Sequence, residues 1–121
     1  MAKDLEISFL LDFYGDVLTE KQRDVMEQYY NDDLSLAEIA ANFGISRQGV
    51  RDSIKRGEAI LLDLEQKVGF AGRYRLIQKG VEKIEQLAND IRFYASSEYM
   101  RGAEVSRAAE QILAELQNIS E

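Results

Sequence analysis

Apolar residues recur along most of the chain at intervals of three and four positions, and no stretch alternates apolar with polar residues for long. An α-helix turns once every 3.6 residues, so this spacing gathers the apolar residues of each segment on one helical face. The chain has no proline, and its eight glycines are few enough to mark boundaries. The pattern therefore predicts an all-α fold.

Two short helices are predicted near the start of the chain. Leu5, Phe9 and Phe13 share one face of the first, which Gly15 is expected to end. The sequence TEKQ at residues 19–22 has the spacing of a capping box, in which a threonine starts a helix and a glutamine reaches back to it. The apolar face of this second helix comprises Val25, Met26, Tyr29 and Tyr30.

The segment SLAEIAANFGISRQGVRDSIKR, residues 35–56, has the spacing of a helix-turn-helix motif. Ser35 and Glu38 form a second capping-box pattern at its start. The motif needs a small residue at the helix crossing, a turn residue with positive φ, a buried aliphatic residue, a cap, and two core-facing residues one turn apart. These roles fall to Ala40, Gly44, Ile45, Ser46, Val50 and Ile54. The alternative is a helical hairpin without a ligand.

The second helix of the motif is expected to run to Lys67 or Val68, and GFAG at 69–72 is the clearest break in the chain. Two longer helices follow, separated by a turn near residues 101–102. Each has apolar residues at alternating spacings of four and three, typical of a helix that packs on another helix. They are Ile77, Val81, Ile84, Ala88, Ile91 and Ala95 in one, and Val105, Ala109, Ile112, Leu116 and Ile119 in the other.

This pattern divides the chain into a helix-turn-helix domain at 1–68, with its motif at 35–56, and a C-terminal helical extension at 73–121. The extension is expected to pack on the first domain, to form a homodimer, or both.

The composition argues against an enzyme. The absence of cysteine excludes disulfides, zinc fingers and thiol chemistry, and the absence of histidine removes the usual general base at neutral pH and the commonest metal ligand. No catalytic residue, metal site or cofactor is predicted. The apolar stretch FLLDFY is too short to span a membrane, and no signal peptide is recognisable, so we expect a cytoplasmic protein.

The charge is unevenly distributed. The chain has 22 acidic and 15 basic residues, a net charge of −7. Residues 1–45 have a net charge of −7, residues 46–80 of +4, and residues 81–121 of −4. The basic charge therefore begins at the second helix of the motif, where a DNA reader needs it.

The candidate site residues follow from this position. Arg47, Gln48, Arg51 and Lys55 are candidates for reading base edges in the major groove, since arginine pairs with guanine and glutamine with adenine. Candidates for phosphate contacts are Ser46, Arg56, Arg73, Arg75 and Lys79. For each residue a solvated helix face is an equal alternative, and Asp52 would repel phosphate. With few useful positive charges, binding should be modest and sensitive to salt.

Two families show resemblances. Residues 18–66, from LTEKQRDV through SLAEIAANFGISRQGV to the long charged helix, resemble region 4 of bacterial sigma factors, which recognises the −35 promoter element. Over more of its length, from ISFLLDFYGDVLTEKQ to YRLIQKG, the chain is similar to the YlxM-like helix-turn-helix proteins. That resemblance implies a regulatory protein encoded beside the GTPase of the signal recognition particle, with a part in protein targeting.

Two functions remain open. The first is a regulator that binds double-stranded DNA, dimerised by the C-terminal helices. The second is an adaptor that does not bind DNA and instead binds the GTPase or the RNA of the signal recognition particle. The acidic surfaces favour the second, whereas the basic start of the second motif helix favours the first.

Overall fold

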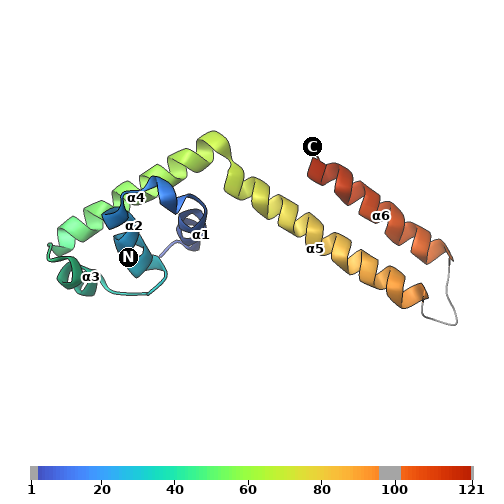
Figure 1. Cartoon of the computed structure of the whole chain (residues 1–121), viewed down its shortest axis with the longest axis horizontal. Coiled ribbons are helices and arrows are strands. Elements are labelled where there is room, and N and C mark those ends of the chain that lie inside the picture. Colours follow the sequence, from blue (N-terminus) through green and yellow to red (C-terminus); the bar gives the residue numbers. More distant parts are fainter. Residues whose placement is uncertain (1–2, 96–101, 121) are drawn as a thin grey trace. The chain divides into compact units, whose positions relative to one another are not determined.

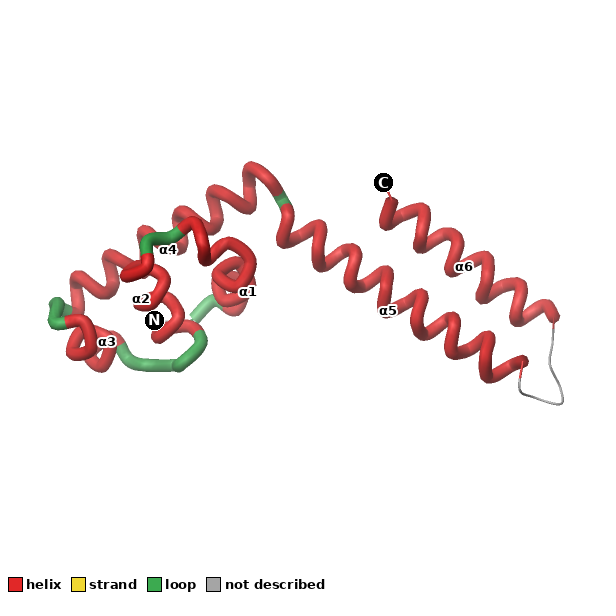
Figure 2. Tube along the Cα trace, viewed as in Figure 1, coloured by secondary structure: helices red, strands yellow, loops and turns green. Residues whose placement is uncertain are grey.

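A computed structural model of the chain describes residues 3–95 and 102–120. These residues form six α-helices and one short 3₁₀ helix, and no strand occurs among them (Figures 1 and 2). The elements are α1 (Leu5–Tyr14), η1 (Gly15–Val17), α2 (Glu20–Tyr30), α3 (Leu36–Phe43), α4 (Arg47–Val68), α5 (Phe70–Ala95) and α6 (Gly102–Ser120). The predicted all-α helix-turn-helix fold is confirmed.

The chain divides into two compact units, Met1–Ala71 and Gly72–Glu121. In the first unit, α4 lies against α1, α2 and α3 and supplies a common wall for the core. The side chains that are completely enclosed there are Leu10, Val25, Met26, Ile39, Val50, Ile54 and Leu61. Burying a side chain of this size contributes about 1.5–3 kcal/mol, so this core holds α4 in place.

The buried face of α1 differs from the expected one. Leu5 is 82% exposed, and Phe9 and Phe13 are only partly buried against the core. The enclosed residues of α1 are instead Ile7, Leu10, Leu11 and Tyr14. Seven of the ten positions of this helix are apolar, so periodicity alone could not select the face that turns inward.

The helix starts follow the predicted capping chemistry. Ser35 and Glu38 form a complete capping box at α3: the Ser35 hydroxyl accepts from the Glu38 N–H, and the Glu38 carboxylate accepts from the Ser35 N–H. At α2 the Thr19 hydroxyl accepts from the Gln22 N–H at 3.2 Å. The return bond expected from the Gln22 side chain is not found within the described part of the chain.

A single residue separates α4 from α5. Gly69 adopts a left-handed conformation (φ 65°), and its N–H donates to the carbonyl of Glu65. The Tyr14 hydroxyl, donating to Glu65 Oε1 at 2.5 Å, accepts from the N–H groups of Phe70 and Ala71. The first N–H groups of a helix have no partner within the helix. In α5 these groups are hydrogen-bonded to side chains of α1 and α4 instead.

In the second unit α5 and α6 run antiparallel (Figure 1). Lys83 Nζ lies 3.1 Å from Glu115 Oε1, and the Arg73 guanidinium donates to the Ile119 carbonyl at 2.6 Å. Residues later in α5 therefore contact residues earlier in α6, as antiparallel helices require. Among the described residues, no helix is both long enough and apolar enough to cross a membrane.

Candidate nucleic-acid interface

The turn of the motif is held by backbone geometry and one cap. Gly44 ends α3 with φ 65°, and the N–H groups of Gly44 and Ile45 both donate to the Ala40 carbonyl. The Ser46 hydroxyl then accepts from the Gly49 N–H at 3.0 Å and starts α4. Ile45 is half-buried against the core rather than enclosed. These contacts fix the point at which α4 leaves the turn.

A close crossing of α4 and α2 sets the distance between these two helices. Gly57 lies against α2, and a Cβ atom placed on it would be 2.9 Å from the sulfur of Met26, closer than real side chains approach. Val50, Ile54 and Leu61 share this inward face and have no exposed surface. The opposite face of the N-terminal half of α4 therefore faces solvent.

Three of the predicted base readers, Gln48, Arg51 and Lys55, lie on the exposed side of α4 next to the buried face, and Arg47 lies at the start of the helix. Arg47, Gln48, Arg51 and Lys55 are all exposed, as are Ser46 and Arg56. They lie at the N-cap and in the first three turns of α4, and the first turn also carries the positive end of the helix macrodipole, which favours anions. The one acidic residue in this stretch is Asp52. A helix N-terminus with this set of side chains suits a polyanionic partner.

Asp52 restrains one of these candidates. The Gln48 Nε2 donates to the Asp52 Oδ1 at 2.9 Å, one turn along the helix. The Asp52 carbonyl also accepts from Arg56 Nε at 3.5 Å. Gln48 would therefore have to leave Asp52 before pairing with a base, whereas Arg47, Arg51 and Lys55 carry no such bond to Asp52.

A groove of about 430 Å³ lies beside α4, between it and the start of α2. It is lined by Thr19, Lys21, Gln22, Ile45, Gly49, Ser53 and Arg56. Two of these residues, Lys21 and Arg56, are basic, so the groove extends the positive surface beyond α4. Sequence reasoning missed Lys21 and Ser53. The capping pattern located the start of α2, but nothing local indicated that it would face α4.

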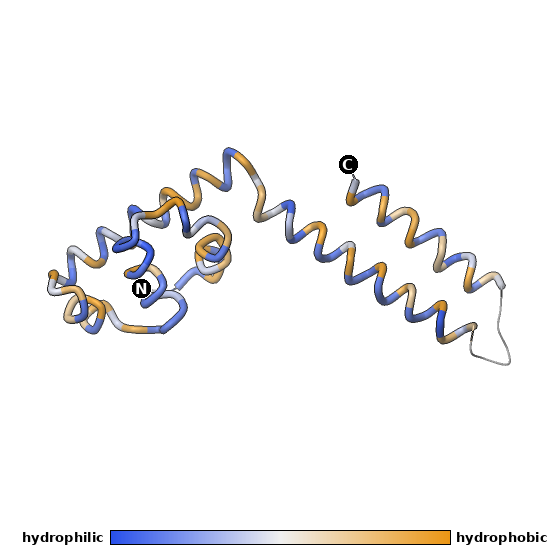
Figure 3. Tube along the Cα trace, in the orientation of Figure 1, coloured by the Kyte–Doolittle hydropathy of each residue, from blue (hydrophilic) through white to orange (hydrophobic). Residues whose placement is uncertain are grey.

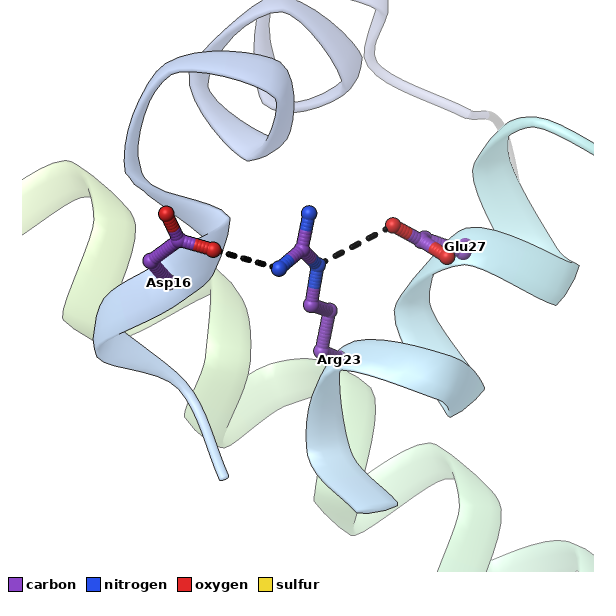
Figure 4. Close-up of polar contacts among 3 residues, drawn as sticks. All are labelled: Asp16, Arg23 and Glu27. Carbon is purple, nitrogen blue, oxygen red and sulfur yellow. Dashed lines mark hydrogen bonds and ion pairs between the residues drawn. The ribbon is translucent and has the colours of Figure 1, made fainter. Parts of the chain in front are cut away.

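Arg23 also lies near the start of α2, but acidic partners occupy it (Figure 4). Its Nη1 lies 2.5 Å from Asp16 Oδ1, and its Nε lies 3.1 Å from Glu27 Oε1. The carboxylates of Glu27 and Asp16 raise the pKa of the Arg23 guanidinium above its usual value. Arg23 therefore joins η1 to α2, and we do not assign it to a ligand.

The hydroxyl groups of two tyrosines hold the rest of α4. The Tyr30 hydroxyl of α2 donates to the Glu58 carboxylate of α4. Burial, and then this bond to Glu58, raises the pKa of Tyr30 well above its usual value. Burial and the bond to Glu65 likewise raise the pKa of Tyr14. These hydroxyls link α4 to α2 and α1, so the reading face has little freedom to rotate.

The other predicted phosphate contacts lie elsewhere. Arg73, Arg75 and Lys79 are exposed residues of α5 in the second unit. Arg73 donates to the Ile119 carbonyl near the end of α6, where a cation also stabilises the negative end of the helix. Arg73 therefore has a structural partner that competes with any phosphate.

The fold and this face define a helix-turn-helix protein. Residues 1–98 match the family described as "Putative helix-turn-helix protein, YlxM / p13 like", and the chain belongs to this family. UPF0122 proteins of Bacillus cereus strain AH187, Bacillus anthracis strain A0248 and Bacillus thuringiensis subsp. konkukian strain 97-27 are each 44% identical to it over 90 residues. The aligned part covers 74% of this chain and 82% of each relative.

Proposed function

We propose that this protein binds double-stranded DNA through the N-terminal half of α4 and acts as a regulator. The observation that carries the proposal is the exposed face of Arg47, Arg51 and Lys55 on a helix held rigidly by the core behind it. A helix of this kind enters the major groove with its N-terminal residues toward the bases. The similarity of residues 18–66 to sigma factor region 4 supports the same reading.

The side chains divide into two groups in this proposal. Arg47, Gln48, Arg51 and Lys55 read base edges, with Arg51 as the main candidate for guanine. Ser46 and Arg56 contact phosphates, and Lys21 joins them from the groove. Arg73, Arg75 and Lys79 of α5 remain candidates for further phosphate contacts. The protein works as a homodimer joined through its C-terminal helices, since helix-turn-helix proteins commonly bind paired half-sites.

The test presents the purified protein, at low and moderate salt, with a pool of fragments from its own genome. We expect selective recovery of a few fragments by the wild type, and loss of that selectivity in Arg51→Ala. Lys67→Ala is the matched control, because it removes the same charge from an exposed position near the other end of α4. If Arg51→Ala recovers the same fragments as the wild type, or loses all fragments to an equal degree, base reading by Arg51 is refuted.

A second candidate function is favoured by exposed acidic residues of the first unit. Asp12, Asp16, Glu20 and Asp24 are all exposed on α1, η1 and α2. A surface of this sign attracts a basic protein and repels nucleic acid. Together with the family resemblance, it supports a part in the signal recognition particle pathway, as an adaptor for the GTPase or the RNA of the particle.

One parallel experiment separates the two functions. The GTPase and the RNA of the signal recognition particle are each offered to the immobilised protein beside the DNA pool. Firm binding of either, with no selective recovery of DNA, would favour the adaptor. Reversing two of these acidic charges by Asp12→Lys with Asp24→Lys should then abolish GTPase binding and leave DNA binding intact or stronger.

A further inference from the structure

Two rows of residues run along α5. One row, which includes Gly80 and Lys83, faces α6. The other is the apolar stripe predicted from the sequence: Ile77, Val81, Ile84, Ala88, Ile91 and Ala95. A Cβ atom on Gly80 would lie 2.5 Å from Ile119 Cδ1, and Lys83 pairs with Glu115, so this side of α5 touches α6. Val81 follows Gly80 and is turned by about 100° from it around the helix. Its side chain is 46% exposed. The apolar stripe that includes Val81 therefore lies beside the contact with α6.

The helix α6 shows the same offset. Glu115 and Ile119 face α5, whereas Leu116, which follows Glu115, is turned away and is 48% exposed. Because α5 and α6 run antiparallel, a turn in the same sense along each chain direction brings both apolar stripes to the same side of the pair. Figure 3 shows hydrophobic positions recurring along both helices. The two stripes together form one apolar face.

This face is incompletely covered within one chain. Among the described residues of the second unit, only Gly80 and Ala108 are buried. Ile77, Ile84 and Ile112, which belong to the stripes, are half-buried. An amphipathic helix is stable when its apolar stripe packs on another element, and a pair of helices cannot enclose two such stripes by itself.

We infer that a second copy of this chain covers this face and that the two helix pairs form a four-helix bundle. The area of this face is large enough for a stable dimer interface. The 26 residues of α5 and 19 residues of α6 correspond to lengths of roughly 39 and 28 Å, and two adjacent helices are about 20 Å wide. The face therefore measures roughly 700 Å², close to the about 800 Å² per partner of a standard stable interface.

The charge distribution selects a second copy over a strongly charged partner. Residues 72–121 contain seven basic and eight acidic residues, whereas residues 1–71 contain eight basic and fourteen acidic residues. Two copies would repel each other through their first units but are almost neutral along the second. A near-neutral apolar face with heptad-like spacing is typical of helices that associate with their own kind.

The test measures the molar mass of the full-length protein by sedimentation velocity between about 1 and 100 μM, without DNA. We expect a dimer for the wild type, and at least about 100-fold weaker association for Val81→Glu with Leu116→Glu, because each charge enters the interface twice. Phe93→Glu is the control: Phe93 is more exposed, at 69%, but lies about 120° around α5 from Val81. A monomeric wild type, or equal weakening by the control, would overturn the inference.

A second measurement covers the case in which the charged variant loses its helices by circular dichroism. The chain has no cysteine, so Val81→Cys and Phe93→Cys each give a single site for a nitroxide label. The label at 81 should become immobilised as concentration rises, and the label at 93 should stay mobile. Identical behaviour of the two labels would refute the assignment of this face as the dimer interface. This inference extends the homodimer of the proposed function. Arg51→Ala should remain dimeric, so DNA binding and dimerisation can fail separately.

Discussion

The crossing of α4 and α2 at Gly57 allows a sharp test of how rigidly the motif is positioned. Gly57→Ala has two opposing effects on the free energy of unfolding. Alanine favours a helix interior by about 1 kcal/mol over glycine. The new Cβ atom, however, would lie 2.9, 3.1 and 3.2 Å from the sulfur, Cγ and Cε atoms of Met26. Ordinary contacts of this kind are about 3.5–4.0 Å, so Met26 has to move.

Met26 has little space in which to move. Its side chain is completely enclosed, and so are its neighbours in the core, Val25, Ile54 and Leu61. Overpacking of this type costs about 1–3 kcal/mol. After the gain in helix propensity, we expect Gly57→Ala to lower the free energy of unfolding by about 1 kcal/mol.

The sign should reverse when Met26 is shortened. Met26→Ala alone should cost about 2–5 kcal/mol, because it leaves a cavity. In that background the methyl group of Gly57→Ala enters the vacated space and retains its helix propensity, so it should stabilise the protein by about 1 kcal/mol. The two substitutions are therefore coupled by about 2 kcal/mol, within the range observed for residues in contact.

The assay is urea unfolding of the full chain followed by circular dichroism at 222 nm, for wild type, both single variants and the double variant. Ala59→Gly, at an exposed position of the same helix, measures the propensity difference directly and should cost about 1 kcal/mol. If Gly57→Ala stabilises the protein by that same amount in both backgrounds, Met26 yields freely and the close crossing does not constrain α4.

Three further predictions concern the reading face, the turn and the Tyr30 hydroxyl. Asp52→Asn keeps a partner for Gln48 but removes a negative charge beside the phosphates of bound DNA. DNA affinity, measured by fluorescence anisotropy, should rise roughly threefold at low salt and less at high salt. Weaker binding would show that Asp52 contacts the ligand favourably. Gly44→Val should cost about 1–2 kcal/mol in urea, because only φ 65° opposes it and no atom lies within 4 Å of its Cβ; Gly44→Asn should cost less, and equal costs would contradict a strain confined to the backbone. The raised pKa of Tyr30 means that the folded state holds this proton more tightly than the unfolded chain, whose tyrosines titrate near pH 10. Stability is therefore fully present below about pH 10 and falls as pH rises above it, by no more than about 1.4 kcal/mol per pH unit from this group; urea midpoints between pH 9 and 11 should fall less in Tyr30→Phe, and parallel curves would exclude Tyr30 as the cause.

The sequence alone determined the features that depend on residues within four positions of one another. Ser35, Glu38 and Ser46 cap their helices as their spacing predicts, and Gly44 supplies the left-handed turn. These are local hydrogen bonds and backbone preferences, so no distant part of the chain is needed to form them. The exposed position of Arg51 and Lys55 follows from the same periodicity that buries Val50 and Ile54, whereas Arg47 is exposed because it is the first residue of α4.

Only the tertiary structure decided which of several possible faces turns inward. In α1, seven of ten residues are apolar, and the packing of α4 selects Leu10 and Tyr14 over Leu5. In α5, two stripes have the same spacing, and the contact with Gly80 decides which of them meets α6. The Tyr14 hydroxyl reaches amides 56 and 57 residues further along the chain. Such contacts depend on how whole helices are oriented against each other, and the periodicity of a single segment carries no information about its neighbour's rotation.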